Sequence, residues 1–182
     1  SDTIVMIAAQ ANTATGTTTF AASVSNLEVL RISDATNSAA GINMANADGI
    51  NSVTLANGVT GGTFPITNAL PGFTLTTNVL SSAVSSIALA TDTTADTVNL
   101  VYAAGNGFTN SGTLTIGSVE TLAITTSNTS SPLVAATTQM TGLIAATAAK
   151  SVTISGNIGF IGDANIGATT LTSFDASGLT GT

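Results

Sequence analysis

The 182-residue chain contains no cysteine, histidine or tryptophan, and each absence removes a class of functional site. Without cysteine there is neither a disulfide framework nor a thiolate metal site. Without histidine there is no imidazole for acid–base catalysis or for binding zinc. Only Arg31 and Lys150 are basic, against nine acidic residues, so the net charge is −7. A chain with this balance cannot neutralise a phosphate backbone, which excludes nucleic acid as a partner.

Charged residues of either sign are scarce, at 6% of the chain, whereas 43% of the chain is apolar. An ordinary soluble domain has roughly 25% charged residues. Val, Ile, Leu and Thr are plentiful here, which favours an ordered chain over a disordered one. A Lys-poor, Cys-free composition rich in Thr, Asn and Gly is typical of exported bacterial surface proteins. We therefore expect a secreted protein at the cell surface.

A short apolar pattern, Leu27-x-x-Leu30-x-Ile32, recurs along the chain. Its further copies begin at Ile50, Val84, Val119, Ala149 and Leu171, at offsets of 23, 34, 35, 30 and 22 residues. Periods of this size are typical of repeat proteins in which one strand per unit stacks on its neighbours. An antiparallel sandwich would instead show tight hairpins about every 8–12 residues. The sequence therefore predicts an all-β fold, a parallel β-solenoid with irregular loop insertions at its corners.

The same pattern and the turn residues between its copies predict where the strands and loops lie along the chain. We expect strands at residues 27–33, 53–56, 73–75, 87–91, 98–103, 114–116, 119–125, 152–155 and 171–176, after an apolar run at 3–9. Residues 11–19 and most of 58–72 are predicted to be loops. Residues 131–150 are the one place where a helix is arguable, because Ser131 and Pro132 could begin one and apolar residues recur near helical spacing.

The ends of the chain suggest a segment of a larger protein. The first residues, SDTIVMIAAQ, carry Asp2 where a secretory signal would have a basic start, and the last, GLTGT, resemble the middle of a turn. No stretch reaches the ~18 continuous apolar residues of a membrane helix, so no membrane insertion is expected. We expect residues 1–182 to form a single solenoid segment of a longer chain.

Most of the carboxylates fall in or beside the predicted turns, where Asn and Gly accompany them. Calcium takes about six to eight oxygen ligands from carboxylates, amides and backbone carbonyls, and such turns present all three. The best local patterns are Asn46-x-Asp48-Gly49-x-Asn51, Asp92-x-x-x-Asp96 and Asp163-x-Asn165. The candidate calcium ligands are Asp34, Asn46, Asp48, Asp92, Asp96, Asp163, Asn165 and Asp175. The alternative is that Asp and Asn occur there because they tolerate turn geometry and bond their own backbone.

No catalytic residue is expected. Asp92 and Asp96 could form a glycosidase carboxylate pair, but their corner has no aromatic subsite and no neighbouring basic residue. Glu28, Glu120 and Lys150 share one slot of the repeated pattern, which indicates a polar corner rather than an active site. Thr-x-Thr repeats raise an ice-binding face as an alternative, although they are out of register with the pattern. The spacing is also similar to leucine-rich repeats, but the Asn expected after the strand is present only at Asn157.

Several phrases of the sequence resemble a known family. The strings SNLEVLRISDA, GSVETLAITTSN, AAKSVTISGN and TSFDASGLTG are similar to the repeating phrases of Gram-negative surface-layer proteins and of related RTX-type β-strand-repeat proteins exported by type I secretion. The resemblance implies a calcium-binding, lattice-forming protein, and it implies that Asp34, Asp48, Asp92, Asp96, Asp163 and Asp175 include calcium ligands. The chain departs from the family in lacking a full GGxGxDxUx nonapeptide, of which only Gly162-Asp163-x-Asn165 is present.

These observations lead to one functional expectation and one alternative. We expect a structural, self-assembling protein of a surface layer or sheath, stabilised by calcium at acidic turns, whose partners are copies of itself. Cell-surface polysaccharide is a second candidate partner. The alternative is the stalk or ligand-binding segment of a large calcium-dependent adhesin, which would remain monomeric.

Overall fold

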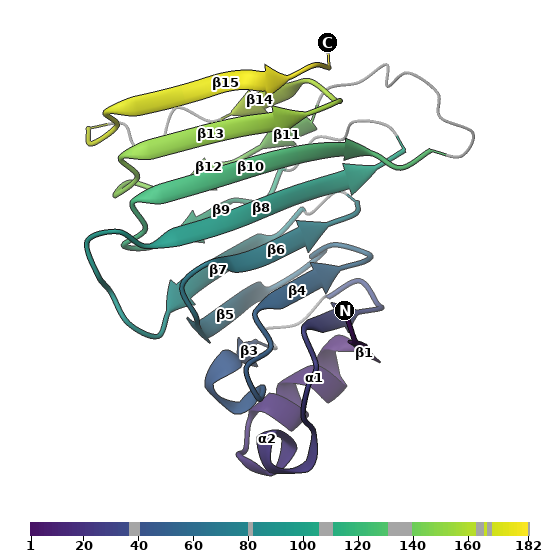
Figure 1. Ribbon diagram of the computed structural model, residues 1–182. Coiled ribbons are helices and arrows are strands. Elements are labelled where there is room, and N and C mark those ends of the chain that lie inside the picture. The colour runs from purple at the N-terminus through teal and green to yellow at the C-terminus, as the bar shows by residue number, and fades with distance from the viewer. Residues whose placement is uncertain are drawn as a thin grey trace.

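The computed structural model describes residues 1–36, 41–79, 82–105, 111–130, 140–162, 166 and 169–181. In this part of the chain every paired strand is parallel to its neighbours, and the chain winds into a β-solenoid of about 6 turns (Figure 1). The expected fold class is therefore confirmed.

The solenoid is dominated by one eight-stranded parallel sheet, here called the large sheet, which forms the front of the view in Figure 1. Its strands follow one another in chain order. They are β1 (Thr3–Met6), β2 (Val29–Ile32), β4 (Ser52–Leu55), β6 (Phe73–Thr77), β8 (Thr97–Ala104), β10 (Thr121–Asn128), β13 (Ser151–Gly156) and β15 (Ser173–Leu179).

A five-stranded parallel sheet, here called the small sheet, lies behind the large one (Figure 1). Its strands are β3 (Ile42–Asn43), β5 (Thr63–Ala69), β7 (Val84–Leu89), β9 (Leu114–Ile116) and β12 (Ile144–Ala145). A shorter parallel pair is formed by β11 (Met140–Gly142) and β14 (Phe160–Gly162). Hydrophobic side chains of both sheets meet in one core between them.

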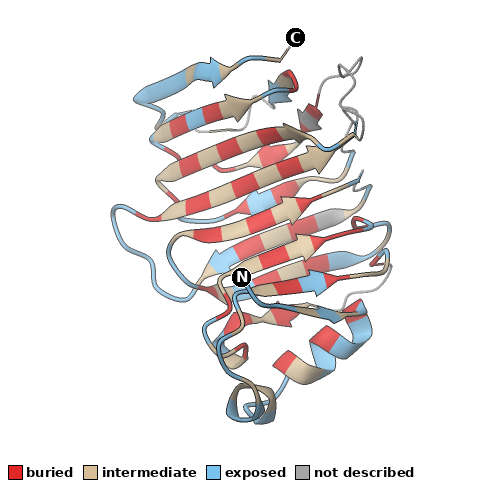
Figure 2. Ribbon diagram, turned by 45° about the vertical axis from the view of Figure 1, so that its right-hand side comes forward, coloured by how far each residue is buried: buried red, intermediate tan, exposed pale blue. Residues whose placement is uncertain are grey.

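The core of the large sheet is a column of stacked aliphatic side chains. Burial alternates along β4, β8 and β10, as the red and tan bands of Figure 2 show, because successive side chains point to opposite faces. Register pairing places one inward residue of each turn on that of the next. This column runs through Ile4, Leu30, Val53, Leu75, Leu100, Ile124 and Ile154. From Leu30 onward its members are at most 6% exposed.

The pairings also explain the uneven period of the sequence pattern. Five of its six copies lie in the large sheet, but the copy at Val84–Leu89 is β7 of the small sheet. The offset of 34 residues thus runs from a copy in the large sheet to one in the small sheet, and the offset of 35 residues runs back again. The large-sheet strands β6 and β8 lie within these two intervals. Measured along the column from Leu30 to Ile154, the true offsets are 23, 22, 25, 24 and 30 residues.

Between β4 and β6 the register of the large sheet steps by two residues relative to the sequence pattern. Val53 of β4 pairs with Leu75 of β6, whereas the sequence pattern would align it with Phe73. A shift of two residues keeps every apolar side chain on the core face, whereas a shift of one would turn them all to solvent. The solenoid therefore accommodates such a step without losing its core.

The first turn contains helices where a loop was expected at residues 11–19, so that prediction is wrong. Helix α1 (Ala8–Thr15) and the short α2 (Thr19–Ser23) lie below the first strands in Figure 1, followed later by the 3₁₀ turn η1 (Met44–Asn46). Ala8 and Ala11 are buried against the core. Alanine is the strongest helix former, but its small side chain leaves no clear apolar periodicity in the sequence.

Two other local predictions are also wrong. Residues 63–69, expected within a loop, form β5, which includes Pro65 and pairs with β7. The arguable helix at 131–150 lies partly outside the described residues, and where it is described, Met140–Gly142 and Ile144–Ala145 are strands. In both segments pairing with the neighbouring turn outweighs local propensity, because strand preference depends strongly on context.

Truncation of a buried inward residue of the large sheet should destabilise the solenoid far more than truncation of an outward residue on the same strand. For Leu122→Ala we expect a loss of about 2–5 kcal/mol in unfolding free energy, because Leu122 is fully buried. The control, Thr125→Ala on the outer face of β10, should cost less than about 1 kcal/mol. Guanidinium denaturation followed by circular dichroism measures both, and equal losses would contradict the assigned inward and outward faces.

Candidate functional site

The candidate calcium ligands lie at separate corners of the solenoid. Asp34 and the Asn46–Asp48 pair lie near the helical end, Asp92 and Asp96 precede β8, and Asp175 lies on β15. Asp163 and Asn165 are outside the described residues. Among the described residues, no three acidic side chains come close enough together to hold a metal ion. Among the described residues, the structure therefore brings together no more than two of the candidate carboxylates at any one place.

Asp34 lies just after β2 and binds the start of the first helix. Its Oδ1 accepts a hydrogen bond from the backbone N–H of Ala8 at 2.8 Å. A carboxylate at a helix N-terminus satisfies an N–H that has no partner within the helix and interacts favourably with the helix dipole. Asp34 thus connects the segment that follows β2 to the first residue of helix α1.

Asn46 and Asp48 belong to the turn that follows β3. The Asn46 amide donates from Nδ2 to the carbonyl of Thr15 at 2.8 Å, so it connects η1 to α1. Asp48 has a positive φ of 48° and is followed by Gly49 at 77°. Asp and Gly are among the residues that tolerate this left-handed conformation. The backbone geometry alone is thus a sufficient reason for Asp-Gly at this corner.

Asp92 and Asp96 lie in the loop before β8 but differ sharply in environment. Asp92 is exposed, whereas Asp96 is only 2% exposed. Both Asp96 oxygens accept hydrogen bonds from Thr93, one from its backbone N–H at 2.6 Å and one from its hydroxyl at 2.7 Å. The Asp96 carboxylate therefore closes its own turn and is not directed at solvent.

Asp96, Glu120 and Lys150 stack on successive turns at one edge of the large sheet. Each immediately precedes its strand, and the carbonyl of each of the first two accepts from the following turn. The Asp96 backbone N–H donates to Glu120 Oε2 at 3.2 Å, and Glu120 Oε1 lies 3.7 Å from Lys150 Nζ. The polar slot predicted for Glu120 and Lys150 is therefore a corner of the solenoid. The Lys150 side chain is 51% exposed and that of Glu120 13%, and the exposure of the lysine to solvent limits what this ion pair contributes to stability.

Asp175 lies exposed on β15, where Ser177 binds it. The Ser177 backbone N–H donates to Asp175 Oδ1 at 2.8 Å. Hydrogen bonds from the Ser177 side chain and then from its backbone lower the pKa of Asp175, because they favour the ionised carboxylate. Asp175 is therefore a strand carboxylate whose hydrogen bond comes from a neighbouring residue of β15.

Asparagine amides connect successive turns near several corners, a role that the sequence analysis did not assign. Asn57 donates to the carbonyl of Ser33 at 2.6 Å, Asn78 to that of Ala103 at 3.0 Å and Asn99 to that of Gly72 at 3.0 Å. The partners lie 24, 25 and 27 residues apart, which is one turn of the solenoid. Each amide thus donates a hydrogen bond to a backbone carbonyl of the neighbouring turn, at or near a corner.

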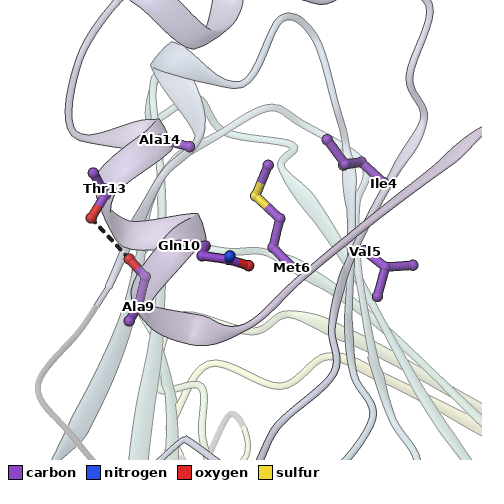
Figure 3. A pocket seen from close by; sticks show the side chains of 7 residues that line it. All are labelled: Ile4, Val5, Met6, Ala9, Gln10, Thr13 and Ala14. Carbon is purple, nitrogen blue, oxygen red and sulfur yellow. Dashed lines mark hydrogen bonds between the residues drawn. The ribbon is translucent and has the colours of Figure 1, made fainter.

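An open groove of about 640 Å³ lies between β1 and α1 (Figure 3). Its lining is mainly apolar and comes from these two elements alone: Ile4, Val5, Met6, Ala9, Gln10, Thr13 and Ala14. None of these side chains is a carboxylate, amine or phenol, so the groove has no group for acid–base chemistry. It can bind only by apolar contact and through a few amide and hydroxyl groups.

The threonine repeats do not form one surface. Thr13 and Thr15 are in α1, Thr74 and Thr76 are on the outward side of β6, and Thr115 is in β9 of the small sheet. These elements occupy different sides of the molecule. The ice-binding alternative therefore gains no support from the repeats that suggested it.

No protein family, curated protein or solved structure matches this chain. No helix in the described part of the chain is long and apolar enough to cross a membrane. The functional argument therefore depends on the chain's own geometry.

The two carboxylates of the loop before β8 should differ in their effect on stability. Asp96→Ala leaves the N–H and hydroxyl of Thr93 without their acceptor, and we expect a loss of about 1–3 kcal/mol in unfolding free energy. Asp92→Ala should change it by no more than about 0.5 kcal/mol, since Asp92 is exposed. Both are measured by denaturation in the presence of a chelator. A larger loss for Asp92→Ala would indicate a role that the structure does not explain.

The pKa of Asp175 should depend on Ser177. Ser177→Ala removes the larger of the two hydrogen-bonding effects, so the pKa of Asp175 should rise toward its usual value. Because the folded-state pKa is lowered, the contribution of this carboxylate to stability is present above its unfolded pKa and is lost as pH falls through the lowered one. Carboxyl-carbon NMR titration measures the shift. Ser173→Ala, on the same strand, is the control and should leave the Asp175 titration unchanged.

Proposed function

We propose that this chain is a structural building element that assembles with copies of itself into a surface layer or sheath outside the cell. The observation that carries the proposal is the outer face of the large sheet, which is continuous and carries no charge from β4 to β13. Its outward residues are Ser52, Thr54, Thr74, Thr76, Thr97, Asn99, Val101, Ala103, Thr121, Ala123, Thr125, Ser127, Ser151, Thr153 and Ser155.

A face of small hydroxyl and β-branched side chains suits assembly. Neighbouring molecules can pack on it without burying a charge, which would be costly in the absence of a partner. The acidic groups that give the chain its net charge of −7 lie mainly at the corners and loops, away from this face. Lateral contact between such faces would therefore meet little electrostatic opposition.

The molecule is also suited to a passive role. Its corners are connected by amide–carbonyl bonds between turns, and in the described residues its buried carboxylate, Asp96, is fully engaged by Thr93. The two basic residues, Arg31 and Lys150, are the only sites at which a trypsin-like protease could cut. Rigidity and low reactivity are both useful in a shell.

Calcium enters this proposal as a bridge between molecules. Calcium prefers about six to eight oxygen ligands, and the described part of one chain gathers no cluster of three carboxylates. The expected intramolecular cage at Asp34, Asn46, Asp48, Asp92, Asp96 or Asp175 is thus not supported by their positions. An exposed carboxylate such as Asp92 could instead share a cation with a second copy, together with backbone carbonyls and water.

Calcium and a chelator should therefore change the assembly more than they change the fold. With millimolar calcium we expect ordered sheets or fibres in electron micrographs, and with chelator dispersed particles that keep their β-type circular dichroism. Magnesium at the same concentration controls for ionic strength, since it takes large oxygen cages poorly. A chain that remains monomeric at every calcium concentration would exclude the lattice and favour the stalk of an adhesin.

A further inference from the structure

Two columns of stacked core side chains each contain a small polar residue. In the large sheet, one inward column consists of Ile32, Leu55, Thr77, Tyr102 and Thr126. In the small sheet, one inward column consists of Phe64, Ser85, Leu114 and Ile144. Thr77 and Ser85 are each only 7% exposed. Each therefore places a hydroxyl group in the core, next to larger and mainly apolar side chains.

Thr77 and Ser85 line one small cavity of about 20 Å³, although they come from different sheets. Leu75 and Leu114 form part of the remaining wall, and both are at most 7% exposed. The cavity thus lies in the core between the two sheets and not at the surface. Serine contributes to this space, since Ser85 is smaller than Phe64 and Leu114, with which it pairs on either side.

The hydroxyl groups of Thr77 and Ser85 lack protein partners. In the described part of the chain, neither of them forms a hydrogen bond with another residue. Thr126, in the same column as Thr77, shows the contrast: its Oγ1 donates to the carbonyl of Ile158 at 2.6 Å and accepts from the Ile158 N–H at 3.3 Å. Most buried polar side-chain atoms have a partner, either in the protein or in ordered water. The two hydroxyl groups beside the cavity therefore point to a partner inside it.

The size and chemistry of the cavity decide what that partner is. A water molecule needs a cavity of about 10–15 Å³, so the space of about 20 Å³ holds one water and no larger ligand. Cavities that stay empty in proteins are apolar, whereas a buried water makes about three hydrogen bonds to polar groups around it. A hydroxyl group can donate to such a water and accept from it.

Tyr102 also lines the cavity and carries a third hydroxyl group. Its side chain is 4% exposed and pairs in register with Thr77. Burial raises the pKa of Tyr102 above its usual value, because the charged phenolate would lose its solvation. The phenol is therefore neutral, and all the polar side chains around the cavity are uncharged. This favours water over an ion as the occupant.

We propose that this cavity is a binding site for one structural water molecule, which bridges the hydroxyl groups of Thr77 on the large sheet and Ser85 on the small sheet. The site lies inside a single chain, so this inference does not depend on the proposed self-assembly. The bound water completes the hydrogen bonding of two polar side chains and connects the two sheets across the core.

Oxygen-17 magnetic relaxation dispersion tests this site. It counts the water molecules that stay in a protein longer than the protein takes to tumble, and it observes the water oxygen, so exchange of hydroxyl protons does not contribute. The variant with Thr77→Val and Ser85→Ala removes both hydroxyl groups with little change of shape. We expect its count of long-lived waters to be one lower than that of the unmodified chain.

The matched control carries the same two chemical changes one residue away. Thr76→Val and Ser86→Ala alter the outward neighbours of Thr77 and Ser85 on β6 and β7, and the water count should then stay unchanged. Circular dichroism verifies that both variants fold. Equal counts for the unmodified chain and the core variant would overturn the proposal, and so would an equal loss in the control.

A crystal structure of the unmodified chain locates the water without any variant. We expect a density peak within hydrogen-bonding distance of both Thr77 Oγ1 and Ser85 Oγ. An empty cavity in a map that shows other ordered waters would overturn the site, and a peak bonded to only one of the two hydroxyl groups would overturn the bridge. Either failure would leave the proposed self-assembly in place, because that proposal depends on the outer face of the large sheet.

Discussion

The parallel register between successive turns is the constraint on which the rest of this structure depends. No strand of the large sheet has more than eight residues, and an isolated strand pair of that length is marginal in water. Stacking stabilises the strands in two ways. Each turn forms backbone hydrogen bonds with its neighbour, and it also covers the aliphatic side chains of that neighbour. The column from Leu30 to Ile154 is the result, and it is kept even where the register steps by two residues.

The corners follow from that register. Once the strands are stacked, a side chain at one corner lies over the backbone of the corner one turn away, and an asparagine amide there can satisfy a carbonyl that would otherwise lack a donor. Asn57, Asn78 and Asn99 do so, whereas Asp34, Asp96 and Asp175 act on backbone N–H groups. These hydrogen bonds satisfy many of the polar groups at the corners, although the side-chain oxygens of Asn51 and Asn78 are buried without a partner.

A stack of this kind always has two ends, and sheet edges are natural sites of further pairing. In the described part of the chain, a groove separates β1 from α1, and Phe174 of β15 is 61% exposed. The outer face of the large sheet between these strands carries no charge from β4 to β13, and it is the surface on which the proposed self-assembly depends.

The sequence by itself determined the class of fold, because β-branched and aliphatic residues at a repeated short spacing have few stable alternatives to stacked parallel strands. It also located most large-sheet strands and the polar corner at Glu120 and Lys150. Only the tertiary structure decided that Val84–Leu89 belongs to a second sheet, that Ala8–Thr15 is helical and that no three carboxylates of the described residues converge. Each of these features depends on which residues lie one solenoid turn apart. Because the loops differ in length, the sequence separation between paired residues varies from 22 to 30 along the column from Leu30.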